Sequence, residues 1–266
     1  MITDNLQKAI EWLEKYMQMK RSDGMLWMTS PYAEIDEETS GVIPGKVYVI
    51  AWYSNTGKSK FAYTYANHYL WKKKKVHFYS LEVDVWMVLW NLACNKYQKR
   101  FWDLELDDIN LEDFDWLSIY DDKYSIDAII QNVMDEKPDV VFIDFIQNVQ
   151  CPGNSEYERM STIARDVQQL AIQSGATVFS LSQVSNTTGR DISKWDRSFI
   201  SLKGAGELYA SSEVVFLLSN QDGYIACSII KNKFGKKNID FLFDVDFSRW
   251  VFVLQKVQDK NQKTTF

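Results

Sequence analysis

The most constraining feature of the chain is a β-rich run that leads into a Gly-Lys-Ser sequence and then into a helical stretch. The run Val47–Trp52 consists of aliphatic and aromatic residues, which is typical of a buried strand. A strand, a loop and a helix start in this order form an anion site, because backbone N–H groups and the helix dipole point at the same place. We therefore predict a phosphate-binding loop formed by Ser54, Asn55, Thr56, Gly57, Lys58 and Ser59.

Two side chains of this loop are suited to nucleotide chemistry. Lys58 supplies a point charge for the β- and γ-phosphates, and the Ser59 hydroxyl is a ligand for Mg²⁺. The full motif is GxxxxGK[ST], and Trp52 stands where its first glycine is expected. The alternative interpretation is a turn before a surface helix. The strand before the loop and the helix after it favour a nucleotide site, so ATP and Mg²⁺ are the predicted cofactors.

The second half of such a site is an acid at the end of a buried strand. Asp139-Val140-Val141-Phe142-Ile143-Asp144 supplies it, with four apolar residues and then a carboxylate. A lone aspartate in this place is otherwise a helix cap or a turn residue. Because Lys58 lies in the same pattern of strands and helices, we predict that Asp144 holds Mg²⁺.

The order of strands and helices predicts an α/β domain. Short β-rich runs alternate with helical ones up to residue 181, which indicates right-handed crossovers and a largely parallel sheet. After Gly206 four short runs follow closely and are predicted as antiparallel additions to the sheet edge. The predicted strands are Val47–Trp52, 76–81, Leu117–Tyr120, 140–145, 177–181, 214–218, 224–230, 239–243 and 250–254, with helices at 58–72, 84–98, 125–136 and 157–173.

Composition and charge exclude several classes of protein. The chain of 266 residues is 46% hydrophobic, which suits a packed core, and it has neither an apolar run long enough for a membrane span nor a secretory signal. Three cysteines and two histidines exclude a disulfide framework and a His-rich metal site. Residues 101–127 carry ten acids and one lysine, so the remainder of the net charge of −6 sums to +3. We expect a cytoplasmic protein, or one of the host cytoplasm if the source is viral, with no membrane partner.

Taken in order, the motifs of the chain resemble the ATPase domain of DnaB-type replicative helicases, which are hexameric motors. The resemblance covers roughly residues 5–255 and implies a RecA-like P-loop NTPase fold at 46–266, preceded by an amphipathic helix and linker at 1–45. The motifs are Gly41-Val42-Ile43-Pro44-Gly45-Lys46, Gly57-Lys58-Ser59, Tyr79-Ser80-Leu81-Glu82, Ile143-Asp144-Phe145-Ile146-Gln147, Leu181-Ser182-Gln183, Leu202-Lys203-Gly204-Ala205-Gly206 and Ile230-Lys231-Asn232-Lys233.

The resemblance implies catalytic roles for further side chains. Glu82 would orient and polarise the attacking water, although an acid here also suits a helix cap. Gln183 would contact the γ-phosphate and pass its state to the DNA loops. Lys231 and Lys233 would reach the γ-phosphate of the neighbouring subunit, with Lys233 standing where the helicases usually have arginine. The alternative for this lysine pair is a solvated edge strand.

The resemblance also implies partners. A helix at 4–20, with Leu6, Ile10, Leu13 and Met17 on one face, would pack on the adjacent ATPase domain and hold a homo-oligomer, a hexameric ring, together. The segment 184–203 has a net charge of +2 and a Ser/Thr/Asn/Gly-rich composition, which suits contacts with the phosphates of single-stranded DNA. A primase or a loader would be a further partner. The predicted DNA contacts are Arg190, Lys194, Arg197 and Lys203.

Three functions are consistent with these residues. The first is an ATP-dependent DNA helicase that couples hydrolysis to movement on single-stranded DNA in replication. The second is a RecA- or KaiC-like recombination ATPase, which the lysine pair favours. The third is a nucleotide-gated assembly module that hydrolyses weakly, which Trp52 and the missing arginine favour.

Overall fold

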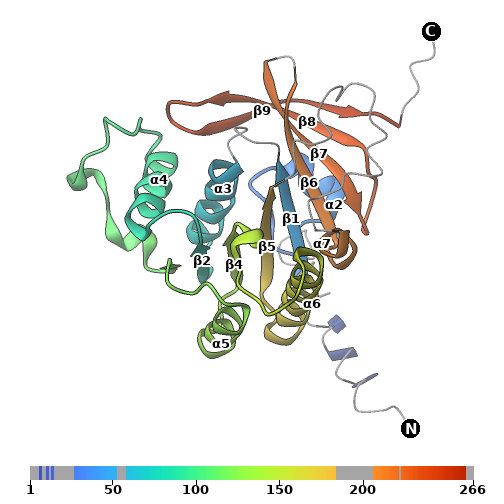
Figure 1. Ribbon diagram of the computed structural model, residues 1–266. Helices are drawn as coiled ribbons and strands as arrows, with labels where there is room; N and C mark the ends of the chain where they lie inside the picture. Colours follow the sequence, from blue (N-terminus) through green and yellow to red (C-terminus); the bar gives the residue numbers. More distant parts are fainter. Residues whose placement is uncertain are drawn as a thin grey trace.

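The fold is built around one mixed sheet whose strands lie in the order β3-β2-β4-β5-β1-β6-β7-β8-β9 (Figure 1). The computed structural model describes residues 6–7, 10–11, 13–14, 27–52, 58–183, 206–221 and 223–261. The strands are β1 (Val47–Trp52), β2 (Val76–Ser80), β3 (Leu117–Tyr120), β4 (Val140–Asp144), β5 (Thr177–Gln183), β6 (Val214–Gln221), β7 (Tyr224–Asn232), β8 (Ile239–Asp246) and β9 (Val251–Asp259).

The parallel part of the sheet extends one strand further than the sequence predicts. All the pairings among β1 to β6 are parallel, and those from β6 through β9 are antiparallel. The prediction that the 214–218 run is an antiparallel addition was therefore wrong at its junction with the core, because β6 lies parallel to β1. The chain returns through α7 to the start of the sheet after β5, so β6 runs in the direction of the other parallel strands.

The helices fall close to their predicted ranges. Four long helices follow the strands as the alternating pattern indicates, and the short helix α7 and three 3₁₀ turns were not predicted. None of the helices in the described ranges has both the length and the apolar content that crossing a bilayer requires. The helices are α2 (Ala33–Thr39), α3 (Lys58–Trp71), α4 (Val85–Tyr97), α5 (Ile126–Glu136), α6 (Glu156–Ser174) and α7 (Gly206–Ser211), with 3₁₀ turns at Leu106–Asp108, Leu111–Phe114 and Ile146–Asn148.

The alternating side chains of β1 divide the core into two layers. Tyr48, Ile50 and Trp52 pack toward α3 and α4, whereas Val47 and Val49 pack toward α5, α6 and α7. Successive side chains of a strand point to opposite faces of the sheet, so a strand buried on both faces is apolar throughout. Helices consequently cover both faces of the parallel sheet (Figure 1), and β1 is fixed as its central strand.

The segment before β1 packs on the same core. Helix α2 was not predicted, and its Ile35 is fully buried in the layer that contains α3. Met28 pairs with Val42 in an isolated bridge. The described residues between 6 and 14 are helical, as predicted, with Leu6 51% exposed; most of the 4–20 helix lies outside the described residues. The division of the chain at residue 45 stays a prediction.

Candidate functional site

Lys58 and Ser59 occupy the start of the helix that follows the central strand. They are the first two residues of α3, so the unpaired N–H groups and positive dipole end of this helix lie beside them. Figure 1 places this helix start at the carboxyl end of β1. The predicted phosphate-binding residues Ser54, Asn55, Thr56 and Gly57 lie outside the described residues.

Three charged groups converge at this edge of the sheet. The ammonium of Lys58 lies 2.7 Å from Oε2 of Glu82 and 4.0 Å from Oδ1 of Asp144. Ser80 and Asp144 are level in the β2–β4 ladder, so the two acids leave neighbouring parallel strands at the same height. The structure thus brings together Lys58, Glu82 and Asp144, which the sequence predicted as one site.

The Asp144 carboxylate is buried and incompletely satisfied. It is 2% exposed, and its Oδ1 atom has no hydrogen-bond partner among the described residues. Burial raises the pKa of Asp144 to about 6, against the opposing effects of the Lys58 charge and the Ser59 hydroxyl. A buried acid with a spare oxygen next to a serine hydroxyl fits Mg²⁺, which takes oxygen ligands and completes its shell with phosphates and water. Within the described ranges no three His, Cys, Asp or Glu side chains are grouped to hold a metal alone.

Aromatic rings form a wall around the Lys58 ammonium, and this wall was not predicted. The ammonium lies 4.4 Å from the ring centre of Trp52 and 4.5 Å from that of Phe145. The two rings meet edge to face, with centres 6.4 Å apart, and Trp52 is 2% exposed. Trp52 therefore fills the core where the motif expects glycine, while its face attracts the cation. The sequence signal was Trp52 itself, which we had noted only as a departure from the motif.

Gln183 lies at the tip of β5, level with Trp52 in the β1–β5 ladder. Its backbone carbonyl accepts a hydrogen bond of 3.0 Å from Nε2 of Gln147, which also donates to the hydroxyl of Ser182 at 3.0 Å. Gln147 lies in the turn that follows Asp144, so it ties the metal-site strand to the tip of β5. We had quoted Gln147 within a motif but assigned it no role.

The lysine pair lies at the other end of the parallel sheet. Lys231 pairs with Val215 of β6, which in turn is level with Val49 in β1. A strand of this length spans about 20 Å, and Lys58 follows its opposite end. The structure therefore does not bring Lys231 or Lys233 to the Lys58 site of the same subunit.

Both lysines have partners within the subunit. The ammonium of Lys231 donates to the carbonyls of Tyr209 and Ala210, the latter at 2.9 Å. Lys233 follows β7 directly, and its ammonium lies 3.2 Å from Oε1 of Glu213. Both lysines border a cavity of about 690 Å³ together with Lys236 and Lys237. The predicted DNA contacts Arg190, Lys194, Arg197 and Lys203 lie outside the described residues.

Comparisons with known proteins place this fold among helicase domains. The chain superimposes on the solved ATPase domain of a DnaB-like helicase with a TM-score of 0.77 and 20% identity, covering 96% of this chain and all of that one. It also superimposes on a DnaB-like replicative helicase, studied with its interactions with primase, with a TM-score of 0.74 and 21% identity. That match covers 91% of this chain and 65% of the helicase chain. No protein-family model and no curated protein matches the sequence. The predicted fold, that of a DnaB-like helicase ATPase domain, is confirmed.

Proposed function

We propose that the protein is an ATP-hydrolysing, ring-forming motor that moves along single-stranded DNA and acts as a helicase in DNA replication. The observation that carries the proposal is the convergence of Lys58, Glu82 and Asp144 at the carboxyl edge of a parallel sheet, beside a helix start. Ligands of open α/β sheets bind at this edge. The likeness in fold to two helicase domains supports the same assignment.

In this proposal Lys58 binds the β- and γ-phosphates of ATP with the backbone of Ser54, Asn55, Thr56 and Gly57. Ser59 and Asp144 hold Mg²⁺, and the spare Oδ1 atom of Asp144 supports that role. When bound, the ion neutralises charge that develops on the phosphate oxygens. The Trp52 and Phe145 rings keep water from the Lys58 ammonium, which strengthens its attraction for phosphate.

Glu82 acts on the attacking water in this mechanism. Its side chain is 47% exposed, so a water molecule can reach it. In the nucleotide-free protein its carboxylate is bound to Lys58, and an incoming γ-phosphate competes for that cation. Binding of ATP would thereby release Glu82 for general-base work. Gln183, held by Gln147, reports the presence of the γ-phosphate.

The lysine pair completes the site of a neighbouring subunit. Because Lys233 lies at the opposite end of the sheet from Lys58, it reaches a nucleotide only in a head-to-tail assembly, where that nucleotide belongs to the neighbour. We therefore propose a homo-oligomer, a hexameric ring, in which the helix at 4–20 packs on the adjacent ATPase domain. Arg190, Lys194, Arg197 and Lys203 contact DNA phosphates, and a primase or loader is a further partner.

A second candidate is a RecA- or KaiC-like recombination ATPase. It is favoured by Lys233, a lysine where the helicases usually carry arginine. Electron microscopy with ATP and single-stranded DNA separates the two candidates, since closed rings support the helicase and helical filaments the recombinase.

The experiment that tests the proposal is Mg²⁺-dependent ATP hydrolysis, measured with and without single-stranded DNA. We expect stimulation by DNA, and a loss of at least about 100-fold in Lys58→Ala, because the phosphates lose their fixed positive charge. Lys72→Ala, just past the other end of α3, is the matched control and should behave like the wild type. Hydrolysis that ignores DNA, or its absence, would contradict the motor and favour a weakly hydrolysing assembly module.

A further inference from the structure

Glu213 joins the second lysine of the pair to the central strand. One carboxylate oxygen, Oε1, binds the ammonium of Lys233 at 3.2 Å, and the other, Oε2, accepts the backbone N–H of Val47 at 3.3 Å. The backbones are paired as well, because Glu213 N–H donates to Val47 at 2.9 Å and Lys233 N–H donates to Glu213 at 3.1 Å. Glu213 is 8% exposed, so this carboxylate is buried with every oxygen in use.

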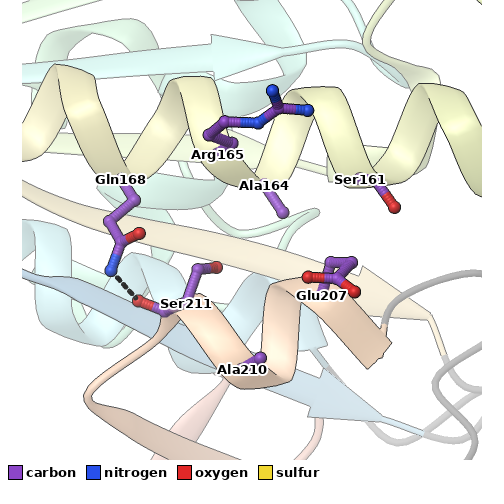
Figure 2. A pocket seen from close by; sticks show the side chains of 7 residues that line it. All are labelled: Ser161, Ala164, Arg165, Gln168, Glu207, Ala210 and Ser211. Carbon is purple, nitrogen blue, oxygen red and sulfur yellow. Dashed lines mark hydrogen bonds between the residues drawn. The ribbon is translucent and has the colours of Figure 1, made fainter.

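The helix that precedes Glu213 is fixed from two sides. On one side Nε2 of Gln168 in α6 donates to the Ser211 carbonyl at 3.0 Å, a contact drawn in Figure 2 across the cavity between α6 and α7. On the other side Lys231 donates to the carbonyls at the end of α7 and lies 4.9 Å from the ring centre of Tyr209. Residues 206–213 therefore form a fixed support from which the Glu213 carboxylate reaches Lys233.

The two lysines differ in what they have left to offer a ligand. Burial lowers the pKa of Lys231 to about 8, and its ammonium is already shared between two carbonyls and an aromatic ring. The Lys233 side chain is 44% exposed, and its ammonium has three N–H donors. One donor binds Glu213, which leaves two for an anion outside the subunit.

We propose that Glu213 is a positioning residue for Lys233, the cation that reaches the neighbouring subunit's nucleotide, and that Lys231 anchors α7 instead of reaching across. The inference rests on the proposed function. A lysine stem has several rotatable bonds, and a carboxylate behind the ammonium fixes its position before the phosphate arrives. Because Glu213 also binds Val47, the trans-acting cation is fixed to the strand that ends at the subunit's own phosphate loop.

The test is the rate of DNA-stimulated ATP hydrolysis by Glu213→Gln in the wild-type and Lys233→Ala backgrounds. Glutamine keeps the acceptor for Val47 but removes the charge that holds Lys233. We expect kcat to fall about tenfold with KM unchanged, and no further effect of the substitution when Lys233 is absent. Asp259→Asn is the matched control, because it breaks a carboxylate–lysine pair at 3.6 Å, with Lys236, on the same cavity. It should leave the rate unchanged.

A structural role for Glu213 gives a different result. If Glu213→Gln lowers the rate by the same factor with and without Lys233, or leaves the wild-type rate unchanged, the positioning role is overturned while the motor stands. If the wild-type protein itself shows no hydrolysis, both proposals fall. Glu213→Asp keeps the charge on a shorter side chain, so its rate should lie between those of Glu213→Gln and the wild type; a rate at or below that of Glu213→Gln would contradict the inference.

Discussion

The two ends of the central strand differ in how their charged side chains are satisfied. At the carboxyl end, Asp144 is buried with an oxygen that has no hydrogen-bond partner among the described residues, and Lys58 is held by the half-exposed Glu82. At the amino end, both oxygens of Glu213 are in use, on Lys233 and on the backbone of Val47.

The difference indicates what each end still requires. A buried polar atom without a partner costs free energy, and a protein retains one where a ligand completes the set. The carboxyl end is thus suited to bind Mg²⁺ and a nucleotide. The amino end is complete within the subunit and has only spare N–H donors to present. One end receives a ligand, and the other contributes to the site of a neighbour.

The largest effect is expected at the carboxyl end, in Glu82→Gln. An amide cannot take a proton from water, so the steady-state rate of ATP hydrolysis should fall by about 10²–10⁴-fold. Binding of ATP should persist, because the Lys58 ammonium loses a competing carboxylate. Asp84→Asn, an exposed acid two residues away, is the control. Equal losses in the two variants would show that Glu82 has no special role.

Trp52→Ala should lower the free energy of unfolding by about 3–5 kcal/mol, because a buried ring is lost and leaves a cavity. Urea titration measures the change. Trp102→Ala, whose ring is 84% exposed, should shift the unfolding free energy by no more than about 0.5 kcal/mol. A small effect at Trp52 would mean that its ring is not the floor of the Lys58 site.

A smaller effect is expected at Asp36, a buried acid in the segment that precedes the amino end. Its two oxygens accept the Ser30 N–H at 2.8 and 3.0 Å, and burial raises its pKa to about 6. The folded state therefore binds a proton more tightly than the unfolded chain, so this contribution to stability is present at low pH and lost as the pH rises toward 6.

Relative to Asp36→Asn, the wild type should lose at most about 3 kcal/mol of unfolding free energy between pH 4 and pH 6. Urea titrations of both proteins across this range measure the difference, and other titrating groups cancel. A difference that does not change with pH would show that Asp36 ionises as it does in the unfolded chain.

Local pattern was sufficient to predict the parallel sheet. Strands such as Val47–Trp52 are buried on both faces and read as continuous apolar runs, so their limits coincide with prediction. Helices α2 and α7 are short, and their burial comes from contacts with distant elements, which a local pattern does not reveal. The direction of β6 was mispredicted for the same reason, since a strand's partner is set by the return path of the chain.

The candidate site follows the same rule. Lys58, Glu82 and Asp144 could be predicted because each lies at or just after the end of a strand, and parallel strands end at one edge. Phe145 and Glu213 could not, because their roles depend on contacts across the fold, 4.5 Å to the Lys58 ammonium and 3.2 Å to that of Lys233. The order of the motifs also did not show that Lys231 is occupied by α7.

The central claim, that the two ends of β1 serve different subunits' sites, is tested most directly by mixing two inactive variants. Lys58→Ala lacks a phosphate cation, and Lys233→Ala lacks the cation for its neighbour. In a head-to-tail assembly of equal parts, about one quarter of the junctions combine an intact Lys58 with an intact Lys233. We predict that mixing restores hydrolysis to a similar fraction of the wild-type rate. Mixed assemblies that form, as shown by co-purification of differently tagged subunits, yet stay inactive would contradict the account.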